Sequence, residues 1–135
     1  MANEAVKRYD ESSGHGGVIQ DYTCADTDAF EKGTLLMLAD PRTASGSVTI
    51  GAACVGICAR EKVKSDGRTQ VSVYKKGYFD MIASGAITVG TPVMAAGHAN
   101  YVHALSGPTW SGSSEIGVAE EEAAADETIL IRLDL

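Results

Sequence analysis

The sequence predicts an all-β fold, a small barrel or sandwich whose two halves resemble each other. A Gly-Thr-x-x-Met strand opening stands at residues 33–37 and again at residues 90–94. Each opening is followed by an aliphatic-Gly-aliphatic core and then, after a polar turn, by an alternating strand. The composition agrees, because 15 glycines and only 6% aromatic residues call for a core of small aliphatic side chains on closely packed strands. Duplicated short strands of this kind are typical of a closed or stacked β scaffold.

The chain of 135 residues is long enough for one domain with a buried core. The N-terminal stretch differs from the rest, because it has mixed charge, a glycine-rich run and too few aliphatic residues to fold alone. We therefore expect an extended, flexible arm over residues 1–20, ordered only where it lies on another surface. A single β domain should follow over residues 21–135.

The first half should open with a strand over residues 34–38. Pro41 ends this strand, because proline cannot donate to a ladder of hydrogen bonds. The next apolar stretch covers residues 48–59. Its apolar content alone would also permit a helix, but Gly51, Gly56 and the β-branched residues around them favour a strand.

An Asp-Gly pair at residues 66–67 is the best local turn signal in the chain. Between two alternating stretches, such a pair predicts a tight hairpin turn in which both central residues have positive φ. We expect strands 55–63 and 69–75 to pair antiparallel around it.

The second half should continue with an apolar segment at residues 77–82 and a loop at residues 83–86. A second hairpin is expected around residues 96–100. The last segment, residues 128–135, alternates apolar and polar side chains without a break, which predicts a strand with one buried face.

The formal net charge of −7 argues against a general nucleic-acid binder, whose affinity depends on basic residues that displace counterions from phosphates. Residues 60–76 contain six basic and two acidic side chains, whereas residues 115–135 contain one basic and seven acidic side chains. Opposite charge on two parts of one domain suits head-to-tail contact between copies, or docking on a charged protein surface. Two solvated faces that keep the protein soluble are the alternative.

No stretch approaches the roughly 18 to 20 apolar residues of a membrane span, and the N-terminus lacks the pattern of a signal peptide. We therefore expect no membrane partner and synthesis in the cytoplasm. Cys54 and Cys58 lie in a predicted strand, about 13 Å apart at ~3.3 Å per residue. That distance is too long for a disulfide, so the cysteines should be small buried residues.

The sequence offers no constellation of residues for catalysis, cofactor binding or metal binding. His15, His98 and His103 have no metal-ligand spacing, and no cysteine pair has C-x-x-C spacing. The glycine-rich run at residues 14–17 lacks the phosphate-loop pattern, and no serine lies in a G-x-S-x-G elbow. We predict that the protein is not an enzyme and has no cofactor or metal.

Residues 74–94 resemble the core of small phage head decoration (cement) proteins, where an aliphatic strand ending in Gly precedes a G-x-I-x-x-G-x-P-V step. Residues 115–119 and 128–133 resemble later strands of that family, so the likeness covers about residues 30–135. It implies a β-barrel or β-tulip-like domain on the outer surface of a bacteriophage capsid, often as a homotrimer, in contact with the major capsid protein. The chain departs from the family pattern in an arm with charges of both signs and in the acidic turn at residues 120–127.

A flexible arm beside a rigid β domain can add a strand to the sheet edge of a partner. Many copies on one shell then gain from multivalency. The arm, the basic hairpin and an exposed loop therefore provide the candidate partner-binding residues. These are Val6, Tyr9, Val18, Ile19 and Tyr22 from the arm, Lys62, Lys64 and Arg68 from the hairpin, and Trp110 from the loop.

Two other functions stay open. Gly-Thr-x-x-Met strands also occur in hammerhead-type barrels that resemble biotinyl domains, so a small β-barrel carrier or ligand-binding module is the alternative. Lys64 and Lys75 lack the flanking residues of a modified lysine in such domains. A small enzyme such as a hydrolase is the third hypothesis.

Overall fold

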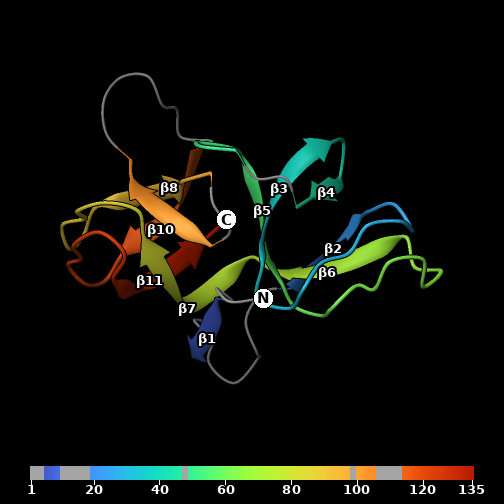
Figure 1. Cartoon of the computed structure of the whole chain (residues 1–135), viewed down its shortest axis with the longest axis horizontal. Helices are drawn as coiled ribbons and strands as arrows, with labels where there is room; N and C mark the ends of the chain where they lie inside the picture. The colour runs from blue at the N-terminus through green and yellow to red at the C-terminus, as the bar shows by residue number, and fades with distance from the viewer. Residues whose placement is uncertain (1–4, 10–18, 47–48, 98–99, 106–113) are drawn as a thin grey trace.

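The computed structural model of the chain is all-β, as the sequence predicts (Figure 1). It describes residues 5–9, 19–46, 49–97, 100–105 and 114–135. These residues contain eleven strands. They are β1 (Val6–Tyr9), β2 (Ile19–Thr23), β3 (Leu35–Asp40), β4 (Thr43–Ser45), β5 (Cys54–Cys58), β6 (Gln70–Tyr74), β7 (Lys76–Ala83), β8 (Pro92–Ala95), β9 (Tyr101–Ala104), β10 (Glu115–Ala119) and β11 (Thr128–Asp134).

The strands form two barrels of five strands each. The first barrel is closed in the order β2-β4-β3-β5-β6. In the second barrel the order is β7-β11-β10-β8-β9, and a parallel pairing between β7 and β9 completes the ring. Strand β1 is added to β7 outside this ring. Figure 1 shows the two barrels side by side along the long axis of the molecule.

The predicted duplication is confirmed strand by strand. Strands β2 to β6 of the first barrel have the same pairing pattern as strands β7 to β11 of the second. Each barrel has one parallel pairing, β2 with β4 and β7 with β9, and its other pairings are antiparallel. A repeated sequence pattern has therefore folded into a repeated topology.

One steric constraint explains the glycine in the middle of each aliphatic-Gly-aliphatic core. A Cβ at Gly56 would collide with the backbone carbonyl of Tyr74, and a Cβ at Gly117 would collide with that of Arg132. Gly56 also has a φ of 147°, which residues with a Cβ rarely adopt. The neighbouring strand passes so close that only glycine fits at either position.

The two barrels share buried contacts. The apolar core of the second barrel also includes Leu35 and Ile57 of the first. Asn100, just before β9 of the second barrel, contacts the first barrel at this junction. It is 2% exposed and has a φ of 60°. Its side-chain Oδ1 accepts a hydrogen bond of 2.8 Å from the Leu35 N–H, and its Nδ2 donates one of 2.8 Å to the Gly33 carbonyl. One asparagine of the second barrel thus satisfies two backbone groups of the first.

The loop around Asp66 differs from the predicted tight hairpin. Strands β5 and β6 do pair antiparallel, but residues 59–69 connect them in a longer loop. Positive φ angles occur at Ser65 and Gly67, so within the Asp-Gly pair only the glycine has the predicted conformation and Asp66 does not. The reason is a long-range contact, an isolated β-bridge between Phe30 and Lys62 that holds the start of the loop. The short strand β4 was not expected either.

Of the expected apolar strand at residues 48–59, only β5 (Cys54–Cys58) is a strand, and residues 50–53 form a turn and irregular backbone. The strand predictions for the second half agree better with the structure. Strands β8 and β9 form the hairpin expected around residues 96–100. In β11, every second residue from Ile129 to Leu133 is buried, as the alternation predicts. Among the described residues, none belongs to a helix of the length and hydropathy needed to cross a membrane.

The N-terminal strand lies on the second barrel. Val6–Tyr9 pair with β7, and the Ala5 N–H donates a hydrogen bond of 2.7 Å to the Gly33 carbonyl. Strand β2 begins at Ile19, so the predicted boundary between arm and domain at residue 20 falls inside a barrel strand. The division into an arm and one domain otherwise stays a prediction, and residues 1–4 and 10–18 lie outside the described residues.

Candidate functional site

The structure brings Lys62, Lys64 and Arg68 together on the loop of residues 59–69, called the tip loop below. Sequence alone suggested three exposed cations. Lys62 is instead 2% exposed, while Lys64 is exposed and Arg68 is half-buried. Lys62 is therefore corrected from a surface contact to an internal residue of the site.

The Lys62 ammonium group is saturated with acceptors. Its Nζ donates to the Asp26 carbonyl at 2.9 Å, to the Val63 carbonyl at 3.0 Å and to Asp66 Oδ1 at 2.8 Å. An ammonium group has three donors, and a buried one is tolerated only when they are paired. The lysine thus ties the tip loop to the turn that contains Asp26.

Asp66 is the second residue, after Lys62, whose side chain holds the tip loop together. Its carboxylate also accepts hydrogen bonds from the Val63 N–H at 3.2 Å and from the Arg68 N–H and Nε, both at 2.9 Å. The hydrogen bond from Lys62, followed by that from the Arg68 backbone, holds the pKa of Asp66 well below its ordinary value. The loop is therefore fixed around an ionised carboxylate.

A groove of about 510 Å³ lies beside the tip loop. Its lining includes Phe30, Thr34, Gly46, Val63 and Lys64. The equivalent place in the second barrel, beside the isolated bridge between Ile87 and Ala123, has a groove of about 500 Å³. The residues lining this second groove are Ala86, Ile87, Thr88, Glu122, Ala123, Ala124 and Glu127. The duplication has therefore produced two related grooves with different chemistry.

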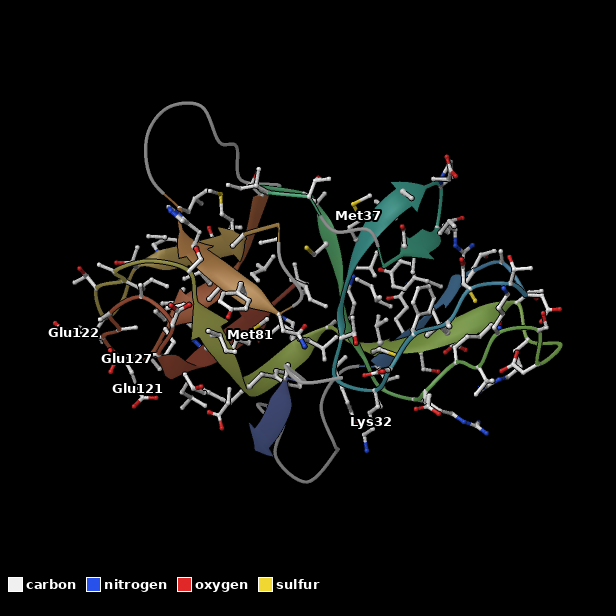
Figure 2. All side chains as sticks on the ribbon, viewed as in Figure 1. Lys32, Met37, Met81, Glu121, Glu122 and Glu127 are labelled. Carbon is white, nitrogen blue, oxygen red and sulfur yellow. The ribbon has the colours of Figure 1, made fainter. Side chains whose placement is uncertain are left out.

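The charge of the two barrels also differs. Residues 19–75 contain seven basic and seven acidic side chains, a formal net charge of zero. Residues 76–135 contain two basic and eight acidic side chains, a formal net charge of −6. The excess of basic residues at positions 60–76 is therefore largely neutralised by acidic residues of the first barrel. Asp26 and Asp66, for example, both lie next to Lys62. Figure 2 shows Glu121, Glu122 and Glu127 together at the end of the second barrel.

The arm residues do not join the tip loop. Val6 and Tyr9 lie in β1, on the second barrel. In β2, Ile19 is 52% exposed, whereas Tyr22 is half-buried and its hydroxyl accepts a hydrogen bond of 2.6 Å from Lys75 Nζ. Val18 and Trp110 lie outside the described residues. All of these remain predicted partner contacts.

Two residues of the site were missed from the sequence, Phe30 and Val63. Phe30 belongs to the buried core of the first barrel and also lines the groove. Val63 is 54% exposed. An aliphatic residue between two lysines at the end of a predicted strand was the signal available for Val63. Nothing local pointed to Phe30, because its bridge to Lys62 joins residues far apart in the chain.

The cysteines have the environment expected of packing residues. Cys24 and Cys58 are buried, Cys54 is half-buried, and all three are free thiols. Burial raises the pKa of all three thiols, that of Cys54 to about 12. Within the described part of the chain, no three His, Cys, Asp or Glu side chains are grouped to hold a metal ion.

The sequence matches the model of a known protein family. A family model described as phage cement protein matches residues 14–134. Among solved structures, the head fiber gp8.5 N base of bacteriophage phi29 is similar with a TM-score of 0.54 and 18% sequence identity. The similarity covers 87% of this chain and 95% of that one, and at this identity it speaks for the fold. No curated protein matches the sequence.

Proposed function

Because the chain belongs to the phage cement protein family, we propose that it binds the outer surface of a phage capsid and stabilises the shell. The family is one of structural proteins of the phage capsid, as the sequence resemblance predicted. The proposed contacts are with the major capsid protein and with neighbouring copies of this chain. The observation that carries the proposal is the family match over nearly the whole chain.

The double barrel suits such a role physically. Among the described strands, the closed order leaves few unpaired edges, so we expect contacts with a partner to use side chains, the tip loop or the N-terminal strand. Each contact can be weak, because many copies bound to one shell act at high effective concentration. The protein would then resist expansion of the shell without performing any chemistry, and the proposal includes no enzymatic activity and no cofactor.

The proposal is tested with heads of the encoding phage purified without this protein. Adding the purified chain should give co-sedimentation with the heads and a higher temperature of DNA release or shell disruption. Bovine serum albumin at the same concentration serves as the control. A chain that stays in the supernatant at every concentration, or binds without changing shell stability, would contradict the cement role.

The arm is proposed as a second contact, with its aliphatic and aromatic side chains on the shell. A truncation should remove residues 1–18 and stop there, because Ile19 and Gln20 pair with β6 in the first barrel. The truncation also removes β1, which pairs with β7, and the buried Ala5, so we expect a chain that keeps the far-UV circular dichroism of a β protein, unfolds at a lower temperature and binds heads more weakly. If it binds as well as the full chain, the arm has no part in binding.

The homotrimer is likewise a proposal. Native mass spectrometry of the free chain and the symmetry of the bound density would test it independently. A free monomer that forms threefold clusters only on the shell would show that the trimer assembles on the capsid. Isolated single copies on the shell would contradict the trimer. Synthesis in the host cytoplasm is part of the same proposal.

A further inference from the structure

We propose that the groove between Phe30 and Val63 is the surface that docks on the major capsid protein, and that the second barrel faces the solvent. This inference rests on the proposed function and deepens it by naming the contact face. Because the two barrels are duplicates, each serves as a reference for the other. Three differences between equivalent places in the two barrels point to the first barrel.

The first difference is the lining of the two grooves. Phe30 and Ile87 occupy equivalent places, since each forms the isolated bridge beside its groove, with Lys62 and with Ala123. The residues that follow the bridge are Val63 and Ala124. Phe30 and Ile87 are both almost fully buried, at 5% and 3% exposed, so the difference lies in the next residue: Val63 is 54% exposed, where the second barrel has only the methyl group of Ala124. The first groove therefore presents the larger exposed aliphatic side chain to a partner.

The second difference is the buried lysine. Ala123 shows that the fold needs only a methyl group at this position, yet the first barrel buries an ammonium group there, which is unfavourable unless it is fully paired. The pairing fixes Val63 on both sides. The Val63 carbonyl accepts from Lys62 Nζ at 3.0 Å, and the Val63 N–H donates to Asp66 Oδ2 at 3.2 Å.

An exposed aliphatic side chain with both backbone groups held is preorganised for binding. Ordering a loop during association lowers affinity, and a loop that is already ordered avoids that loss. In the second barrel, both backbone groups of Ala124 are also paired, but with Glu127 alone: its N–H donates to Glu127 Oε1, and its carbonyl accepts from the Glu127 N–H at 3.3 Å. The additional charged contacts of the first barrel therefore act on the one residue that projects apolar surface beside the groove.

The third difference is net charge. Many copies of the chain sit close together on a shell, so barrels with a formal charge of −6 repel one another wherever they approach within a Debye length of about 8 Å. Neighbouring molecules diverge with distance from a convex shell, which favours the acidic barrel on the outside. The first barrel, with a formal charge of zero, can crowd against the shell without this repulsion.

The partner that fits the groove is a segment of the capsid protein with an apolar side chain. Charged side chains of both signs line the groove, Lys64 together with Glu31 and Glu61. A partner of either sign would find a complement there. We therefore expect binding to depend little on salt, unlike docking through the acidic barrel, where screening would change the affinity strongly.

The test uses a matched pair of substitutions, Val63→Asp and Ala124→Asp. Both positions are exposed and equivalent in the two barrels, so the same carboxylate is added to either groove without disturbing a core. Binding to purified heads is measured by co-sedimentation, and circular dichroism checks the folding of each variant. We expect Val63→Asp to weaken binding about tenfold or more, and Ala124→Asp to change it less than about twofold.

A milder variant, Val63→Ser, should weaken binding less than Val63→Asp and in the same direction. Equal effects of the two Asp substitutions, or no effect of Val63→Asp, would overturn the assignment of the docking face. So would a steep loss of wild-type binding between about 50 and about 500 mM salt. Failure of the wild-type chain to bind heads in any condition would instead reject the proposed function.

Discussion

Asn100 joins the two barrels, and its contacts determine how much its replacement should lower the free energy of unfolding. The Asn100→Ala substitution removes the acceptor for the buried Leu35 N–H, while the Gly33 carbonyl keeps the hydrogen bond from the Ala5 N–H. A buried donor without a partner costs about 1–3 kcal/mol. Alanine at a φ of 60° adds about 1 kcal/mol. We therefore expect the free energy of unfolding to fall by about 2–4 kcal/mol.

Arg42 provides the matched control for this substitution. It precedes β4 as Asn100 precedes β9, has a φ of 55°, and its carbonyl accepts from the Thr23 N–H as that of Asn100 accepts from Ile82. Its side chain is exposed, and arginine already has the Cβ that makes a positive φ unfavourable, so Arg42→Ala should change the free energy of unfolding by less than about 0.5 kcal/mol. Asn100→Gly should recover that part and keep the loss of the hydrogen bonds.

Urea denaturation followed by circular dichroism measures all three variants, and hydrogen exchange of the Leu35 amide reports on the junction itself. The amide should exchange faster in Asn100→Ala than in Arg42→Ala. If Asn100→Ala and Arg42→Ala lower the free energy of unfolding by the same amount, the buried hydrogen bonds contribute nothing and the account of the junction is wrong.

Two further predictions concern the backbone and the charge of the tip loop. Gly56→Ala and Gly117→Ala should each prevent folding or expression in soluble form, because the new methyl group meets a backbone carbonyl, whereas Gly67→Ala has open space and should cost only about 1 kcal/mol for its φ of 83°. Three variants of equal stability in thermal denaturation would disprove the close approach. The second prediction is a pH dependence. The folded pKa of Asp66 lies below its ordinary value of 3.8, so its stabilisation is complete above that pH and disappears as the pH falls through the folded pKa. Asp66→Asn should therefore be less stable than wild type at pH 7, and the difference should shrink in acid; a difference independent of pH would count against the ionised carboxylate.

The strands that the sequence predicted well are those whose signal is local. In β11 the alternation of apolar and polar residues extends over the whole strand, and one face is buried as expected. The duplicated openings predicted a repeated scaffold, because the same turn and close-packing requirements select the same residues twice. Local patterns of this kind need no knowledge of distant partners.

The features that escaped prediction depend on residues far apart in the chain. Lys62 has the pattern of an exposed cation, and its burial depends on the Asp26 carbonyl, 36 residues earlier. Asn100 has the pattern of a turn residue, which it is, but its side chain bonds to Leu35. The three residues of β4 are too few to show a periodicity. The neutrality of the first barrel becomes visible only when the structure shows that residues 19–75 fold as one ring, which brings Asp26 beside Lys62 of the basic segment.

The most direct test of the cement role is electron cryomicroscopy of heads with and without the added chain. The account predicts additional density on the outer surface of the shell, shaped as two small barrels, with the tip loop of the first barrel against the capsid protein and the acidic end of the second toward solvent. Identical reconstructions at saturating protein would contradict the proposed function. Density with the acidic barrel against the shell would contradict the docking face alone.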